Sequence, residues 1–294
     1  MEVRTLDVPG ASLHYEVRGS GPVALLICGG IYDAAAYAGL AGQLADRYTV
    51  VTYDRRGNSR SPLTGPPVPQ RIEEHADDAS RLLAEVSPHA PAYVFGNSSG
   101  AQIGLALAER HPEQVRVLVA HEPPLLSLLP DAAHWESVMA DVERAYADGG
   151  AGAAMGLFGA AMGMGGGEDS GDEDSGGEDS GDQDSGGSGG GAEPPSPEMQ
   201  EMFARLEKNT DFFIGYEVPP FGRWTPDVDG LRGSSVPIVL VAGEESAGEP
   251  PHRSAYALAE RLGTPVETYP GGHGGFGMSA DEFATRLDAA FSGS

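Results

Sequence analysis

Short apolar runs alternate with helix-like segments along most of this chain of 294 residues. The runs are rich in β-branched residues and include "VALLI" at 23–27, "AYVF" at 92–95 and "PIVLVA" at 237–242. Apolar strands separated by helices are typical of a parallel sheet that helices cover on both faces. The pattern therefore predicts an α/β fold with a mostly parallel central sheet. The segment 3–18 differs, because it alternates in period two around "VPGAS" and so predicts an antiparallel hairpin at the sheet edge.

The alternation of strands and helices stops between residue 123 and about residue 225. Two helical stretches, 131–148 and 195–209, flank a glycine-rich piece at 149–167. We therefore expect a helical cap, 123–225, inserted into a core formed by 1–122 and 226–294. The glycines predict a mobile, loosely specified lid. Methionines gather in the cap, where they suit an adaptable surface over a substrate pocket, although ordinary helix packing explains them equally well; they are Met139, Met155, Met162, Met164, Met199 and Met202.

An acidic tandem repeat lies inside the predicted cap. "EDSGDEDSGG" is followed by "EDSGDQDSGG" at 168–187, with no apolar residue to bury, so we expect disorder over about 165–195. Calcium binding is the alternative, because Asp and Ser oxygens could ligate a hard cation. The spacing does not match an EF-hand loop, and the default prediction is a solvated polyanionic loop with no metal site.

Charge and cysteine usage exclude several classes of function. The formal net charge is −26, a field that repels phosphate backbones and anionic membrane surfaces, so neither nucleic acid nor membrane is an expected partner. The single cysteine, Cys28, lies in an apolar run and predicts a buried thiol rather than a disulfide. The N-terminus lacks the basic start and apolar run of a signal peptide, and we expect a cytoplasmic protein. Nothing in the sequence indicates an oligomeric state.

The strongest chemical signal is "AYVFGNSSGAQIGLALAERHP" at 92–112. An apolar strand leads into Gly96-Asn97-Ser98-Ser99-Gly100, and a helix follows, which is the setting that gives the G-x-S-x-G pattern its meaning. A sharp turn there would hold Ser98 in a strained conformation, with the glycines letting strand and helix approach closely. Ser98 is therefore the candidate nucleophile.

These motifs resemble the α/β-hydrolase superfamily, and the resemblance covers nearly all of the chain outside the cap. "YDRRGNSRS" at 53–61 is similar to the superfamily's loop after its fourth strand, and "YPGGHGGFGMSADEFATRLDAAF" at 269–291 is similar to its histidine loop and last helix. The resemblance implies that His273 is the general base. It also implies catalysis without a cofactor.

An activated serine needs preorganised donors for the oxyanion that forms. One expected donor is the backbone N–H of Ser99, directly after the nucleophile. The second should come from "CGGIYD" at 28–33, where the superfamily commonly has His-Gly and this chain has Cys28-Gly29. The donor is a backbone amide, so the role can survive that difference. Gly30 is the first choice and Ile31 the reserve, and Tyr32 is expected to line the same pocket.

The acid of the triad does not follow the superfamily's common pattern. Many members carry Gly-x-x-Asp after the seventh strand, whereas "VAGEESAGEPP" has Ser246 at the fourth position. A serine cannot supply the charge that stabilises an imidazolium. Glu244 and Glu245 are adjacent, but each is displaced along the loop.

Glu122 is the favoured acid. It ends the strand expected in "VLVAHEPPLL" at 117–126, and this sixth strand is expected to neighbour the strand that carries Ser98. Some members of the superfamily place the acid there, among them the fungal zearalenone lactonases, which the "HEPP" region resembles. The two prolines that follow would stiffen the exit. His121 would point to the opposite side and is interpreted as a packing or surface residue.

The predicted function is that of a serine hydrolase acting on a small, apolar carboxylic ester or lactone through Ser98, His273 and Glu122. A nucleophilic serine argues against epoxide hydrolases and haloalkane dehalogenases. Peptidase, thioesterase, carbon–carbon hydrolase and perhydrolase chemistry remain open, because they can share a triad. The alternative from another functional class is a non-catalytic binding protein with the same fold. Its one support is Ser246, which stands where the superfamily commonly has the acid of the triad.

Overall fold

A computed structural model describes residues 1–163 and 197–293 of the chain. Eight strands form one sheet in the order β1-β2-β4-β3-β5-β6-β7-β8. All neighbours from β4 to β8 are parallel, so the predicted α/β fold with a mostly parallel sheet is confirmed. The strands are β1 (Glu2–Val8), β2 (Ala11–Arg18), β3 (Val23–Ile27), β4 (Thr49–Tyr53), β5 (Ala92–Asn97), β6 (Val115–His121), β7 (Ile238–Gly243) and β8 (Val266–Tyr269).

The first two strands form the antiparallel hairpin that the period-two pattern predicts. β1 lies at the edge of the sheet, with Val8 opposite Ala11 at the turn. The central strands are different, because β3 and β5 are buried along their whole length. Continuous burial explains why these strands are apolar at every position rather than at alternate ones.

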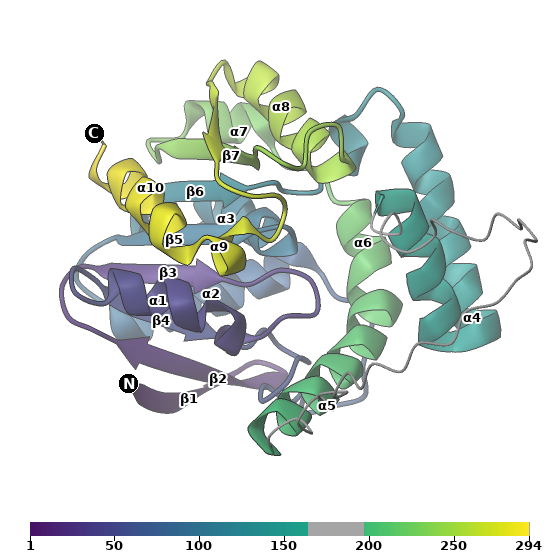
Figure 1. Cartoon of the computed structure of the whole chain (residues 1–294), viewed down its shortest axis with the longest axis horizontal. Coiled ribbons are helices and arrows are strands. Elements are labelled where there is room, and N and C mark those ends of the chain that lie inside the picture. Colours follow the sequence, from purple (N-terminus) through teal and green to yellow (C-terminus); the bar gives the residue numbers. More distant parts are fainter. Residues whose placement is uncertain (164–196, 294) are drawn as a thin grey trace, which may run out of the picture.

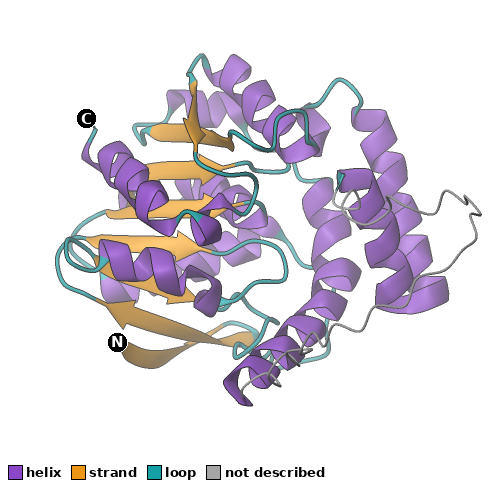
Figure 2. Ribbon diagram, in the orientation of Figure 1, coloured by secondary structure: helices purple, strands orange, loops and turns teal. Residues whose placement is uncertain are grey.

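Helices cover both faces of the sheet (Figures 1 and 2). One core packs α2, α3 and α8 against the sheet, and the other packs α1 and α10 against the opposite face. In α2 the apolar residues Ile72, Ala76, Ala79 and Leu83 recur at helical spacing and are buried, which is why this segment folds as an amphipathic helix. The helices of this part are η1 (Ala34–Tyr37), α1 (Ala38–Leu44), α2 (Ile72–Val86), α3 (Ser99–Arg110), η2 (Pro112–Gln114), α7 (Val228–Gly233), α8 (Pro250–Leu262), α9 (Gly275–Met278) and α10 (Ala280–Ser292).

The described residues between 123 and 225 contain helices and no strand. Figure 2 shows these helices gathered beside the ends of the strands toward which the arrows point. They share a separate apolar cluster that includes Trp135, Met139 and Ile214. This arrangement fits an inserted cap, whose boundaries stay a prediction. The elements are η3 (Leu126–Leu128), α4 (Ala132–Met162), α5 (Pro197–Phe212), the π-helix η4 (Phe213–Glu217) and α6 (Val218–Gly222).

The glycine-rich piece of the cap is helical where the structure describes it. Helix α4 runs through Met162, with a kink at Gly150, whose φ of 72° and ψ of −168° are not helical. Beyond the kink, Ala154, Phe158 and Met162 are four residues apart and buried in the cap's apolar cluster. Packing on this face offsets the low helix propensity of glycine, about 1 kcal/mol per residue. The expectation of a loosely specified segment was therefore wrong for 149–162.

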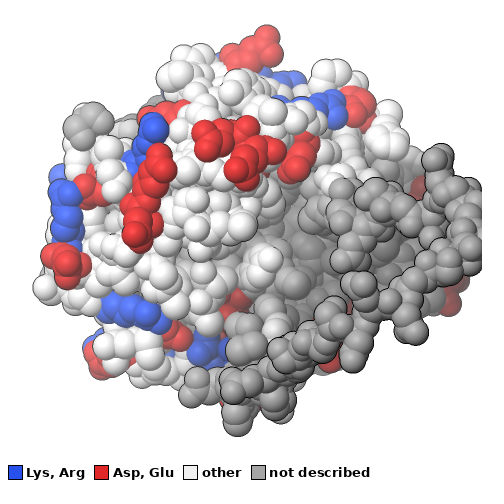
Figure 3. Space-filling model, in the orientation of Figure 1, with Lys and Arg blue, Asp and Glu red and all other residues white. Residues whose placement is uncertain are grey.

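The acidic repeat at 168–187, with its predicted disorder and its calcium alternative, lies outside the described residues. On the face shown in Figure 3, basic side chains lie next to acidic ones rather than in a patch of their own. No helix within 1–163 and 197–293 is both long and apolar enough to span a lipid bilayer. Cys28 is buried as a free thiol, and burial raises its pKa to about 12.

Candidate active site

Ser98 occupies a sharp turn between β5 and α3. Its φ of 53° and ψ of −127° are unusual for a residue with a side chain, and such strain persists only where the surroundings enforce it. A Cβ on Gly96 would lie 2.3 Å from the Gly100 carbonyl oxygen, and one on Gly100 would lie 2.0 Å from the Ile27 carbonyl oxygen. Only glycine at these two positions permits the close approach of strand and helix that holds Ser98 at the surface of a cavity.

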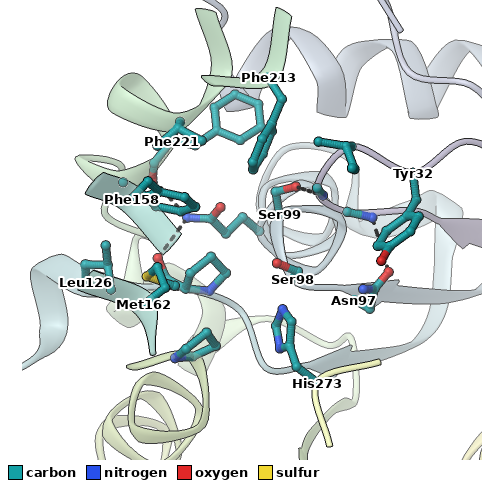
Figure 4. Close-up of a pocket in the computed structure, with 18 of the residues that line it drawn as sticks. Tyr32, Asn97, Ser98, Ser99, Leu126, Phe158, Met162, Phe213, Phe221 and His273 are labelled. Atoms are coloured by element: carbon teal, nitrogen blue, oxygen red, sulfur yellow. Dashed lines mark hydrogen bonds between the residues drawn. The ribbon is translucent and has the colours of Figure 1, made fainter. Parts of the chain in front are cut away.

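Glu122 lies at the end of β6, next to the strand that leads to Ser98. Its backbone is also in the left-handed region, with a φ of 48°, and its side chain is fully buried. One carboxylate oxygen, Oε2, lies 2.6 Å from Nδ1 of His273. Since a carboxylate only accepts, Nδ1 donates, which leaves Nε2 of His273 as the nitrogen that can take a proton from Ser98. Figure 4 shows the His273 ring directed toward Ser98.

The second carboxylate oxygen of Glu122 is held by two donors. Oε1 accepts a hydrogen bond from the Gly243 N–H at 2.9 Å and another from the Ser246 hydroxyl. Burial alone would raise the pKa of Glu122, but the hydrogen bond to His273, nearby histidines and the Ser246 hydroxyl outweigh it and lower the pKa to about 2. Glu122 is therefore a buried, ionised carboxylate with both oxygens bonded.

Ser246 has a structural role that the sequence did not reveal. It stands where the superfamily commonly has its acid, and it donates to the acid that comes from the neighbouring strand. Glu244 and Glu245, the alternative acids, have exposed side chains, and only their backbone N–H groups are bonded, to Tyr269 and Gly271. Of the three candidates, the structure brings Glu122 alone to His273.

His121 is a buried packing residue and not a surface residue. Its ring centroid lies 5.6 Å from that of Phe283 and 6.2 Å from that of His273. Neither ring nitrogen has a hydrogen-bond partner among the described residues. Burial lowers its pKa to about 4, so the ring is neutral at pH 7.

The loop after β3 lies directly against the serine turn. A Cβ on Gly29 would lie 2.3 Å from the Asn97 carbonyl oxygen, so this position requires glycine. The Gly29 N–H donates to Oδ1 of Asn97 at 3.1 Å, and the Gly30 N–H donates to the Ser99 hydroxyl at 3.0 Å. No acceptor within the described part of the chain bonds the N–H of Ile31. Gly30, Ile31 and Ser99 all line the cavity beside Ser98.

The cavity over Ser98 has a volume of about 370 Å³ and mostly apolar walls. Of the methionines expected there, Met139, Met155 and Met162 line it, and the other three lie outside the residues whose side chains are described. Tyr32 also lines the cavity, as expected, and is 46% exposed. Figure 4 labels four further apolar lining residues, Leu126, Phe158, Phe213 and Phe221. Val218 and Phe276 also line the cavity.

The low pKa of Glu122 makes a pH-dependent contribution to stability. Because its pKa of about 2 in the folded chain is below the ordinary value of 4.5, the contribution is complete above about pH 4.5 and is lost as the pH falls toward 2. The wild type should therefore lose more of its free energy of unfolding than Glu122→Gln does as the pH is lowered from 6 to 3, so that the difference between the two proteins decreases. Urea titrations of both proteins measure it, and a constant difference would contradict the assigned ionisation.

Replacing Ser246 with alanine removes one of the three hydrogen bonds to the Glu122 carboxylate. A hydrogen bond to a charged group contributes about 2 kcal/mol, so the free energy of unfolding should fall by about that amount. Turnover should fall by less than about tenfold, because the bonds from His273 and Gly243 remain. Ser87→Ala, which removes a surface hydroxyl bonded to the Ala90 carbonyl, is the matched control.

Comparisons with known proteins identify the family to which the chain belongs. A family model described as the alpha/beta hydrolase fold matches residues 23–277. The uncharacterized hydrolase YraK of Bacillus subtilis (strain 168) is 39% identical over 289 residues, which cover 96% of this chain and 93% of the relative.

Two solved structures share the fold. A thermophilic esterase from Thermogutta terrifontis superimposes with a TM-score of 0.71 and 17% identity, over 100% of this chain and 99% of that one. The enol-lactonase from Burkholderia xenovorans LB400 gives a TM-score of 0.63 and 18% identity, over 98% of this chain and 100% of that one. At these low sequence identities, the two structures support the assignment of the fold and nothing further. With the family model matching most of its length, this chain belongs to the α/β-hydrolase family and is a hydrolase.

Proposed function

We propose that the protein is a serine hydrolase that cleaves a carboxylic ester or lactone through an acyl-enzyme on Ser98. The observation that carries this proposal is the 2.6 Å bond between Glu122 and His273 beside a serine in a strained strand-to-helix turn. A base that is oriented by a buried carboxylate and adjoins a serine is the arrangement that activates a hydroxyl nucleophile.

The proposed reaction begins when Ser98 Oγ attacks the substrate carbonyl carbon and Nε2 of His273 takes the hydroxyl proton. The new charge on the carbonyl oxygen is stabilised by backbone N–H donors, for which Ser99 and the loop at Gly30 and Ile31 are the candidates. When the tetrahedral intermediate collapses, the bond to the alkoxy oxygen breaks and His273 returns the proton to it. Water, deprotonated by His273, then attacks the acyl carbon, the bond between this carbon and Ser98 Oγ breaks, and His273 returns the proton to Oγ, which frees the acid and restores the serine.

The substrate is proposed to be a small and predominantly apolar molecule. The cavity of about 370 Å³ has mostly methionine, phenylalanine and other apolar walls, which stabilise a hydrocarbon acyl or lactone ring by removing it from water. The half-buried acidic residue Glu249 also lines this cavity, and its ionised form would disfavour an anionic group on the substrate. We also propose that residues 123–225 form the cap that closes the cavity. The proposed location of the protein is the cytoplasm.

A fluorophosphonate probe tests the proposal directly. It should label Ser98, and mass spectrometry of the digested protein should find the adduct on the peptide that contains this residue. A panel of p-nitrophenyl esters, γ- and δ-lactones and thioesters of matched acyl length then ranks the substrate classes. Absence of labelling together with absence of turnover would favour the non-catalytic ligand-binding alternative. Labelling with preferred thioester or peptide cleavage would favour the other triad chemistries.

A further inference from the structure

Helix α5 and the π-helix η4 are hydrogen-bonded to the loop at 28–33 and to the residues that hold it, and this loop contains the candidate oxyanion donors. From α5, Asn209 donates from Nδ2 to the Ile31 carbonyl oxygen at 2.8 Å. Arg205, one helical turn earlier, donates to Asp33 Oδ2 at 2.9 Å. Asn209 is completely buried, and its Oδ1 accepts from the Ser59 N–H at 2.6 Å. Helix α5 is therefore bonded to the loop at two successive points.

A buried ion pair reaches the same loop from η4. The guanidinium of Arg55 donates to the carbonyl oxygens of Cys28 and Gly30, the latter at 2.8 Å, and to Glu217 Oε2 at 2.7 Å. The other oxygen of Glu217 accepts from Asn58 Nδ2 at 2.9 Å. The side chains of both Arg55 and Glu217 are 0% exposed. Nη1, Nη2 and both carboxylate oxygens are hydrogen-bonded, whereas Nε of Arg55 has no partner among the described residues. Losing one member of a buried charge pair is costly, because the other charge is then left uncompensated.

These bonds determine where the N–H groups of the loop point. In a trans peptide the carbonyl of one residue and the N–H of the next point in opposite directions. Since Arg55 holds the Gly30 carbonyl, it also orients the N–H of Ile31 in the opposite direction, away from Arg55. Asn209 fixes the following peptide through the Ile31 carbonyl. The Gly30 N–H is already bonded to the Ser99 hydroxyl, whereas the Ile31 N–H has no acceptor in the described part of the chain.

We propose that Arg55, Glu217 and Asn209 are positioning residues that aim the Ile31 N–H at the oxyanion formed on Ser98. The inference rests on the proposed serine-hydrolase function and adds to it a specific donor and its support. Its consequence is that α5 and η4 do more than cover the cavity. While α5 and η4 pack against the loop, the oxyanion site is complete. If they are displaced, the peptide between Gly30 and Ile31 loses the groups that orient it.

Two variants test this role. Asn209→Leu keeps the volume of the side chain and removes its bond to the Ile31 carbonyl, together with its bonds to Ser59. Arg55→Met combined with Glu217→Gln removes both buried charges together, so that neither is left without a partner. Thr210→Val is the matched control, because the hydroxyl of this neighbour on α5 donates to the Leu206 carbonyl of its own helix and to no other acceptor in the described part of the chain. Each protein is titrated with a fluorophosphonate, so that rates are expressed per reactive Ser98.

The measurements separate transition-state from ground-state binding. With p-nitrophenyl butyrate, kcat should fall by about 10- to 100-fold in both test variants, because a misdirected oxyanion donor loses much of its effect, while KM stays within about threefold. A trifluoromethyl ketone, whose adduct with Ser98 carries an oxyanion, should bind more weakly by the same factor as kcat/KM. An alcohol of equal chain length, which carries no oxyanion, should bind as it does to the wild type. Thr210→Val should match the wild type throughout.

Two outcomes overturn the inference while the proposed function stands. In one, both variants keep the wild-type kcat and ketone affinity. In the other, the affinities for ketone and alcohol fall together, which indicates a collapsed cavity and no specific effect on the oxyanion. If the wild type itself neither reacts with the fluorophosphonate nor binds the ketone, the proposed function fails, and the inference fails with it.

Discussion

Ser98→Ala should lower kcat toward esters by about 10⁵- to 10⁶-fold, because it removes the hydroxyl that is proposed to form the acyl-enzyme next to His273. Residual hydrolysis above the rate in water would come from the oxyanion donors and from binding. Ser98 is half-buried and no side chain among the described residues forms a hydrogen bond with its hydroxyl, so the truncation should leave the fold intact. Steady-state rates with p-nitrophenyl butyrate, with unfolding curves for both proteins, measure the effect.

Two controls sharpen this prediction. Ser87→Ala removes a hydroxyl that bonds the Ala90 carbonyl at the surface, and it should change neither rate nor labelling. Ser98→Cys keeps a nucleophile at the same place and should still form a covalent adduct with a thiol-reactive acyl donor. If Ser98→Ala retained more than about one hundredth of the wild-type kcat, an acyl-enzyme on this residue would be ruled out.

Glu122→Gln should lower kcat by about 10³- to 10⁴-fold with little change in KM. An amide has nearly the same shape as the carboxylate, but it carries no charge to stabilise the protonated ring of His273. It can also present its NH₂ group to Nδ1, which would favour the tautomer that keeps the proton on Nε2. The buried position of Glu122, bonded at both oxygens, makes this a loss of chemistry more than of binding.

The competing acids provide the comparison for Glu122. Glu244→Gln and Glu245→Gln change exposed side chains and should leave kcat within about twofold, as surface substitutions usually do. In the Glu122→Gln background, Ser246→Asp would return a carboxylate to the position that the superfamily commonly uses, next to the one that is lost. Partial recovery of kcat is the expected result. A large loss in Glu245→Gln with normal turnover in Glu122→Gln would overturn the assignment.

Much of the core could be predicted because its signals are local. The period-two pattern at 3–18 and the apolar run at 92–95 each depend on neighbouring residues, and both form the elements expected of them. The turn at Ser98 was predictable for the same reason, since Gly96 and Gly100 are required by contacts within one strand–turn–helix unit. Placing Glu122 near His273 needed the order of the strands, which the resemblance to the superfamily supplied.

Other features depend on residues that are far apart in the chain. Glu217 meets Arg55 across 162 positions and Ser246 meets Glu122 across 124, and no local pattern indicates either bond. Ser246 could be recognised from the sequence only as a missing acid. The helix through 149–162 was missed because glycine content argued against it, whereas burial of Phe158 and Met162 on one face decided the outcome. Packing energy thus overrode local propensity.

Ser98 and Glu122 both stand at the ends of neighbouring parallel strands, each with a positive φ that the sheet enforces. His273 lies in a loop with glycine at 271, 272 and 274 on either side of it. The proposed nucleophile and the buried carboxylate thus come from the ends of adjacent strands, while the proposed base comes from a glycine-rich loop. In the proposed mechanism the same ring serves the leaving alkoxide and the incoming water, and its bond to a carboxylate anchored at a strand end keeps it in one orientation for both steps.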